Sequence, residues 1–119
     1  MVKVMIVDDD ASMTKLLKTL LELEPAGFEV TVVPRGAQTL EKAAANPPHL
    51  FMVDFNLNDM DGLEVVHQLR RDARFAQTPI VMVSGLDVEQ EALASGVDMF
   101  LLKPFEPADL PDIFLDLLS

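Results

Sequence analysis

Cysteine is absent from the sequence, and histidine occurs only twice, at His49 and His67. The lack of cysteine excludes disulfides, thiol nucleophiles and Cys-ligated zinc, and two histidines are too few for a His-rich metal site. Basic residues are scarce as well, because nine Lys and Arg stand against 20 Asp and Glu, which gives a net charge of −11. Nucleic-acid affinity comes largely from Lys and Arg on phosphates, so we expect no direct nucleic-acid contact by this chain.

The sequence also lacks a long hydrophobic run. No apolar stretch approaches the ~18 residues of a membrane span, and the start, Met1–Val4, does not have the layout of a signal peptide. We therefore expect no membrane contact and a cytoplasmic location. Half of the 119 residues are hydrophobic, which disfavours disorder and fits a single domain over residues 1–119.

Short apolar runs alternate with helical patterns along the chain. The runs have the length of buried strands, and they occur at Val2–Val7, Phe28–Val33, Leu50–Val53, Ile80–Val83 and Met99–Leu102. The helical patterns begin at Ser12, which can cap the first helix, and continue through Ala37 to Ala44, over Gly62–Arg71, near Val88–Ala94 and from Leu110 to Leu118. Continuous apolar strands separated by helices predict an α/β domain of five βα units, with a parallel sheet covered on both faces.

Four of the predicted strands end in polar residues. The first ends in Asp8-Asp9, the third in Asp54, the fourth in Ser84 and the fifth in Lys103. In an open parallel sheet these ends share one edge, where sites form. If the first and third strands are neighbours, about 4.8 Å apart, three carboxylates converge, which is unfavourable without a cation. Lys103 supplies one positive charge, and a hard divalent ion such as Mg²⁺ would supply the rest.

This set of groups is suited to phosphoryl transfer, which needs mainly in-line positioning and neutralised oxygen charge. Asp54 can take the phosphoryl group as a covalent acyl phosphate. Lys103 can act on that group as a point charge, and Ser84 adds a hydroxyl. The sequence therefore points to a magnesium-assisted reaction at Asp54.

Over its whole length the chain resembles the receiver domain of bacterial two-component response regulators. The resemblance is carried, in order, by Asp8-Asp9, Asp54, Asp61-Gly62, Ser84-Gly85 and Lys103-Pro104-Phe105. It implies a doubly wound, flavodoxin-like sheet with strand order 2-1-3-4-5. It also implies a signalling switch that is phosphorylated on Asp54 by a histidine kinase, a phosphotransfer protein or a small phosphodonor, and that then changes a partner-binding surface. No turnover of a separate substrate is implied.

The resemblance assigns further roles to residues of the site. Asp9 and Asp54 would ligate Mg²⁺ directly, Asp8 would help through water, and the backbone carbonyl of Asn56 would complete the protein ligands. A fused or separate output domain, or a homodimer, is a possible partner.

Other roles concern the phosphorylated state. Ser84 would donate a hydrogen bond to the phosphoryl oxygens and Lys103 would pair with them. Phe100 matches an aromatic switch position whose rotamer follows Ser84, and the Lys103–Pro104 bond would be cis.

Three features depart from the family pattern. Asn58 stands where many members carry proline, so the loop after Asp54 should be somewhat freer. Phe100 lacks the hydroxyl of the commoner tyrosine. Only eighteen residues separate Ser84 from Lys103, which predicts a short or irregular fourth helix and non-standard output or dimer contacts.

Two other functions remain open from the residues. One is an interaction module on the same fold that works without phosphorylation and binds no Mg²⁺. The other is a small Mg²⁺-dependent phosphatase resembling the haloacid dehalogenase group, with Asp8 as the nucleophile of an Asp8-x-Asp10 motif. Single residues also have simpler interpretations: Asp10 as a helix N-terminus, Asp61 as a helix cap and Asp59 as plain loop.

Overall fold

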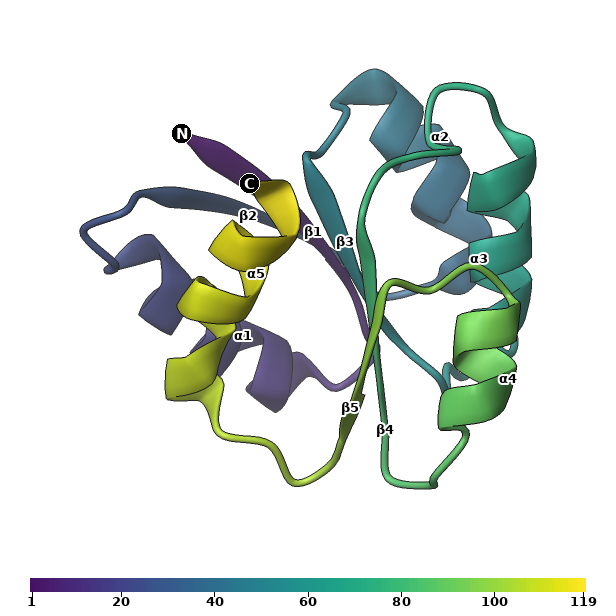
Figure 1. Cartoon of the computed structure of the whole chain (residues 1–119). Helices are drawn as coiled ribbons and strands as arrows, with labels where there is room; N and C mark the ends of the chain where they lie inside the picture. Colours follow the sequence, from purple (N-terminus) through teal and green to yellow (C-terminus); the bar gives the residue numbers. More distant parts are fainter.

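The fold is built on a five-stranded parallel sheet in the order β2-β1-β3-β4-β5. The computed structural model describes all residues, 1–119 (Figure 1). The strands are β1 Val2–Val7, β2 Phe28–Val33, β3 Leu50–Asp54, β4 Ile80–Ser84 and β5 Met99–Leu102. This confirms the predicted α/β class and strand order, and it extends the third and fourth predicted strands by one residue each.

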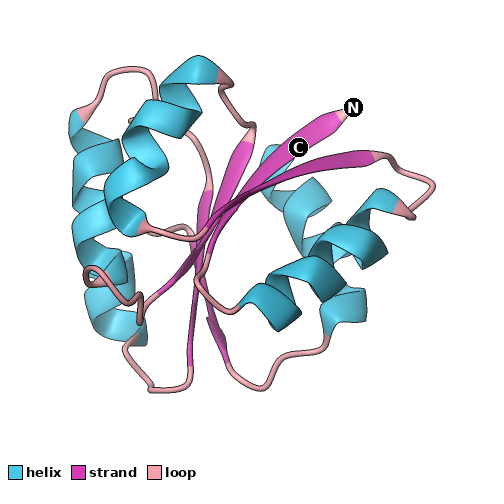
Figure 2. Ribbon diagram, turned by 180° about the vertical axis from the view of Figure 1, so that it is seen from behind, coloured by secondary structure: helices cyan, strands magenta, loops and turns pink.

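Helices cover both faces of the sheet, as Figure 2 shows from behind. The helices are α1 Ala11–Glu22, α2 Thr39–Ala45, α3 Gly62–Arg71, α4 Glu89–Ala94 and α5 Leu110–Leu118, and two 3₁₀ turns, η1 Gly36–Gln38 and η2 Pro107–Asp109, precede α2 and α5. Buried side chains of α1 and α5 share one core cluster, whereas those of α2, α3 and α4 share the other. None of the helices is long and apolar enough to cross a bilayer.

The two cores explain why β1 is apolar from Val4 to Val7 and why β3, β4 and β5 are apolar up to their ends. Side chains along a strand point alternately to opposite faces, so Val4 and Ile6 enter the core beneath α1 and α5, while Met5 and Val7 enter the core beneath α2, α3 and α4. β3 and β4 are buried along their whole lengths. A sheet covered on both faces therefore leaves little room for polar residues until each strand ends.

The first helix begins earlier than predicted. Asp10, and not Ser12, is the N-cap, because its side chain accepts a hydrogen bond from the Met13 N–H at 3.0 Å. The helix ends at Glu22, short of Pro25. Asp10 therefore has the helix N-terminal role that the sequence allowed for it.

The later helices differ in how closely they follow the predicted bounds. α3 spans the predicted residues, with Val65, Val66 and Leu69 fully buried and Leu63 only partly so. α2 is preceded by a 3₁₀ turn and is therefore shorter than predicted. α4 has only six residues, which confirms the predicted short fourth helix.

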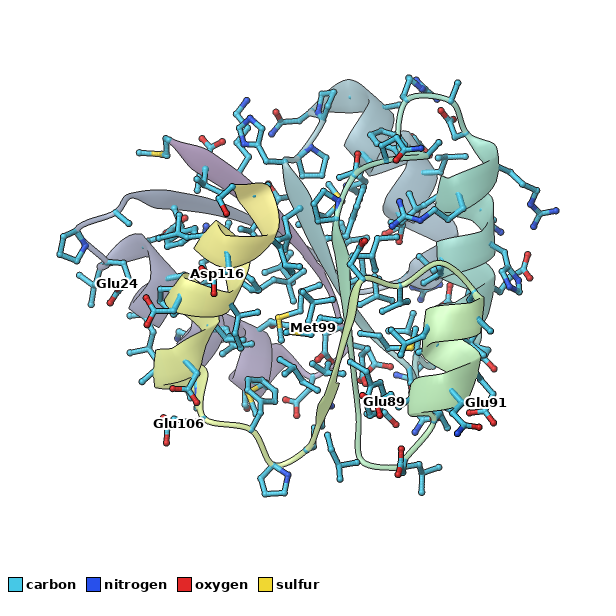
Figure 3. The ribbon with its side chains drawn as sticks, in the orientation of Figure 1. Glu24, Glu89, Glu91, Met99, Glu106 and Asp116 are labelled. Atoms are coloured by element: carbon cyan, nitrogen blue, oxygen red, sulfur yellow. The ribbon has the colours of Figure 1, made fainter.

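Acidic side chains project outward around this fold. Figure 3 labels Glu24 beside α1, Glu89 and Glu91 on α4, Glu106 before η2 and Asp116 on α5. These residues are exposed or half-exposed. They account for part of the net charge of −11 without entering a site.

Candidate phosphorylation site

Three carboxylates meet at the carboxyl ends of β1 and β3. Val7 pairs with Val53 in the register of these neighbouring strands, so Asp8 and Asp54 follow side by side. Asp8, Asp9 and Asp54 each place a carboxylate oxygen within 4.8 Å of the others. The structure thus brings together the three acidic residues that the sequence singled out.

The donor set fits a magnesium ion. Mg²⁺ binds oxygen at about 2.1 Å in an octahedron, which sets neighbouring ligand oxygens about 3 to 4 Å apart. The oxygens of Asp8, Asp9 and Asp54 lie within 4.8 Å of one another, which is close to that spacing. The backbone carbonyl of Asn56 lies in the exposed loop after β3, and no backbone N–H donates to it, so it is available as a further ligand.

Asp8 is the most deeply buried member of the cluster, with 3% of its surface exposed. Burial raises the pKa of this carboxyl to about 6, and the nearby charges of Asp54 and Asp9 add to the rise. The Asp10 N–H, which donates to Asp8 Oδ1 at 2.9 Å, and the Lys103 ammonium lower the same pKa but do not offset the burial. The cluster is therefore short of positive charge.

Lys103 is the cation that faces the cluster. Its Nζ donates to Asp54 Oδ1 at 3.3 Å, and Asp54 is only 6% exposed. The Lys103 N–H donates to the Ser84 carbonyl at 2.8 Å, which holds the end of β5 against β4. The following Lys103–Pro104 bond is cis, as the resemblance implied.

Ser84 and Phe100 lie on the same face of the sheet, because Phe100 pairs with Met82 and Ser84 follows Met82 by two residues. Ser84 is fully buried at the end of β4, where its Oγ accepts a hydrogen bond from the Leu86 N–H at 3.0 Å. Phe100 pairs with Met82 across β4 and β5 and is half-buried against the core beneath α2, α3 and α4. Ser84 lies at the carboxyl edge, whereas Phe100 lies two positions back along the strand pair, and their roles in a switch stay predictions.

Gly62 allows the loop after β3 to close tightly on the backbone of Asp54 and Phe55. A Cβ at this residue would overlap the Asp54 carbonyl oxygen and lie 2.8 Å from Phe55 Cα. The Gly62 N–H donates to the Phe55 carbonyl at 2.7 Å. Asp61 caps α3 by accepting a hydrogen bond from the Leu63 N–H at 2.7 Å, as expected.

Asp59 is not the plain loop residue that was expected. Its two carboxylate oxygens accept hydrogen bonds from the Gly36 N–H at 3.0 Å and the Ala37 N–H at 2.9 Å. These hydrogen bonds, that of Ala37 above all, together with the Arg35 charge hold the pKa of Asp59 below its usual range. Asp59 therefore joins the loop after β3 to the loop after β2. No local sequence motif predicts this contact.

Asn58 adds a second tie that sequence reasoning missed. Its backbone N–H donates to Asp9 Oδ2 at 2.6 Å. A proline has no N–H, so the proline that many relatives carry here could not make this bond. The loop that was expected to be freer is thus anchored directly to a carboxylate of the cluster.

A cavity of about 370 Å³ opens beside the cluster. Its lining residues come from the ends of β1 and β2 and from the loop after β3: Asp9, Pro34, Arg35, Asn58 and Asp59. Arg35 and this cavity were not among the predicted site residues. The cavity meets the acidic cluster at Asp9.

Comparison with known proteins agrees with this geometry. The family model described as the response regulator receiver domain matches residues 4–114. Chemotaxis protein CheY1 of Helicobacter pylori is 33% identical over 115 residues, which cover 92% of this chain and 91% of that protein. The chemotaxis response regulator CheY4 of Vibrio cholerae has a structure that superposes with a TM-score of 0.89 at 31% identity, covering 99% of each chain.

Some relatives are longer. The alkaline phosphatase synthesis transcriptional regulatory protein PhoP of Bacillus subtilis is 34% identical over 111 residues, which cover 91% of this chain but 45% of that protein. The chain therefore spans most of a CheY-type relative and less than half of a transcriptional regulator.

Proposed function

The chain belongs to the family of response regulator receiver domains, and on that premise we propose that it is switched by phosphorylation of Asp54. The observation that carries the proposal is a nearly buried Asp54 carboxylate, paired with Lys103 and clustered with Asp8 and Asp9. The match to the receiver-domain family also argues against the phosphatase interpretation, in which Asp8 was the nucleophile.

In the proposed reaction, an Asp54 carboxylate oxygen attacks the phosphorus of the donor. A new O–P bond forms as the bond between phosphorus and the donor's leaving group breaks, and the leaving group departs with the bonding electron pair. Lys103, already 3.3 Å from Asp54 Oδ1, stabilises the charge on the transferred oxygens. The Ser84 hydroxyl exchanges its contact with the Leu86 N–H for a hydrogen bond that it donates to the phosphoryl group.

Asp8, Asp9, Asp54 and the Asn56 carbonyl would hold Mg²⁺ at this edge of the sheet. The ion, when bound, supplies positive charge that offsets the three carboxylates and the phosphoryl oxygens. Phe100 would follow Ser84 and transmit the change to the surface around α4 and β5.

The proposed setting follows from the family. The donor is a histidine kinase, a phosphotransfer protein or a small phosphodonor, and the location is the cytoplasm. Residues 1–119 act as one receiver domain, which works through a fused or separate output domain or as a homodimer. The short α4 gives these contacts a non-standard surface.

The test is incubation with acetyl phosphate and Mg²⁺, followed by intact mass spectrometry. The wild type should gain the mass of one phosphoryl group, and Asp54→Asn should gain none. Asp10→Asn is the matched control, because asparagine also caps helices and Asp10 lies beside the cluster without belonging to it. An adduct that persists in Asp54→Asn contradicts the proposal, and no adduct together with no Mg²⁺ binding would leave an interaction module independent of phosphorylation.

A further inference from the structure

Arg35 differs from the other arginines of the chain. Arg70, Arg71 and Arg74 each make an ion pair with a carboxylate. The Arg35 side chain makes neither an ion pair nor a hydrogen bond, although it lines the 370 Å³ cavity with two aspartates. An exposed guanidinium without a partner beside a reactive site is available to a ligand.

The carboxylates of Asp9 and Asp59, which line the cavity, accept hydrogen bonds from backbone N–H groups. Both oxygens of Asp59 accept backbone N–H groups from the loop after β2, and Asp9 Oδ2 accepts the Asn58 N–H. The Arg35 charge lowers the pKa of Asp59, but the guanidinium forms no ion pair with either carboxylate. The backbone hydrogen bonds also fix the cavity wall, because the loops after β2 and β3 are bonded to each other through Asp59.

A phosphoryl donor meets unfavourable electrostatics at this edge. The donor is an anion, whereas the chain carries a net charge of −11 and the site itself holds three carboxylates. Lys103 is already paired with Asp54. Arg35 is the cation that lines the adjoining cavity, which reaches the cluster at Asp9. A guanidinium binds carboxylate and phosphate oxygens through two parallel hydrogen bonds.

From this arrangement we propose that the cavity is a binding site for acyl phosphates, with Arg35 as the residue that selects them. The proposal rests on the proposed phosphorylation of Asp54. As the Asp54 oxygen bonds to phosphorus, the P–O bond to the acyl group breaks, and its electron pair leaves on a carboxylate. Arg35 pairs with that carboxylate, so it favours donors whose leaving group is an anion and does little for donors that release a neutral amine.

Two small donors separate these cases. Acetyl phosphate releases acetate, whereas phosphoramidate releases ammonia. The phosphorylation rate of each is followed by intact mass at saturating Mg²⁺ in wild type, Arg35→Ala and Arg35→Lys. Lys42→Ala is the control, because it makes the same change in net charge on α2, outside the cavity.

In Arg35→Ala the rate with acetyl phosphate should fall about tenfold, as for loss of a charge-assisted hydrogen bond. The rate with phosphoramidate should change less than about twofold, in line with general electrostatics. Arg35→Lys should recover part of the acetyl phosphate rate, and Lys42→Ala should match the wild type with both donors.

Equal loss with both donors, or no loss with either, overturns the role of Arg35. A wild type that takes no phosphoryl group from either donor instead overturns the proposed phosphorylation of Asp54. The two failures are therefore distinguishable in the same set of measurements.

Discussion

At the amino ends of β4 and β5, each of the three side-chain nitrogens of Arg70 donates a hydrogen bond within the chain. At the carboxyl ends of β1 and β3, in contrast, three carboxylates lie near the single ammonium of Lys103. Arg70 donates to the carbonyls of Gly96, Phe75 and Thr78 at 2.7 to 2.9 Å and to Asp98 Oδ2 at 3.0 Å. Asp98 Oδ2 also accepts the Ile80 N–H at 2.8 Å. The charges of Arg70 and Asp98 at the amino edge are therefore satisfied by contacts within the chain.

The charges at the carboxyl edge are not all satisfied within the chain. Lys103 is the only ammonium that contacts the cluster, and the pKa of Asp8 is raised to about 6 chiefly by burial. The same sheet therefore holds one charge network that stabilises the fold and another that, under the proposed function, would bind a cation and a phosphoryl group. The comparison predicts that changes at the amino edge affect stability alone, whereas changes at the carboxyl edge also affect the chemistry.

The largest expected effect on stability is at the amino edge. Arg70→Met should lower the free energy of unfolding by about 3 kcal/mol, because it removes one hydrogen-bond donor from each of three carbonyls and from Asp98. Urea denaturation measures the loss, and the folded variant should still be phosphorylated on Asp54.

The neighbouring Arg71 is the control for that variant. Its side chain is 70% exposed and lies 3.5 Å from a Glu64 oxygen, so Arg71→Met should cost less than about 1 kcal/mol. Equal losses for Arg70→Met and Arg71→Met would show that the amino-edge network contributes no more to stability than an exposed ion pair.

The next effect is a pH dependence at the carboxyl edge. The pKa of Asp8 is about 6 in the folded protein and about 3.9 in an unfolded chain. Between these values the folded state binds more protons, so the stabilisation from Asp8 is fully present below about pH 4 and is lost as the pH rises through about 6. The change amounts to about 2 to 3 kcal/mol.

Urea denaturation of wild type and Asp8→Asn between pH 4 and 8, without Mg²⁺, measures this pH-dependent contribution of Asp8 to the free energy of unfolding. Asparagine resembles the protonated acid, so Asp8→Asn should be more stable than the wild type at pH 8 and nearly equal to it at pH 4. A difference that does not vary with pH would contradict the raised pKa of Asp8.

The smallest of these effects concerns the glycine under Asp54. Gly62→Ala should cost about 2 kcal/mol, because the new methyl group overlaps the Asp54 carbonyl and displaces the backbone. It should also slow phosphorylation. Gly85→Ala is the control, since a Cβ there meets nothing within 4 Å. If both variants behave alike in unfolding and in phosphorylation, the close approach of Gly62 to Asp54 has no functional weight.

Much of the carboxyl edge could be predicted from the sequence, because the residues of β1, β3, β4 and β5 that lead up to it are apolar. The polar residues that follow, Asp8, Asp54, Ser84 and Lys103, are therefore marked by position as well as by type. The short α4 could be predicted as well, from the number of residues available between Ser84 and Lys103.

The rest depends on contacts between distant parts of the chain. Asp59 bonds to Gly36 and Ala37 more than twenty residues away, and Arg70 donates mainly to backbone carbonyls, which every residue has. The start of α1 was missed for a local reason: Asp10 and Ser12 are both good caps, and only the contact with the Met13 N–H decides between them.

The most direct test of the contrast between the edges is the effect of Mg²⁺ on thermal unfolding. At ten times its dissociation constant, Mg²⁺ should stabilise the wild type by about 1.4 kcal/mol. Arg70→Met, although less stable, should gain the same amount, while Asp54→Asn should gain clearly less. A wild type whose unfolding does not respond to Mg²⁺, or an Asp54→Asn variant that gains as much as the wild type, would contradict the claim that the carboxyl edge is built to receive a cation.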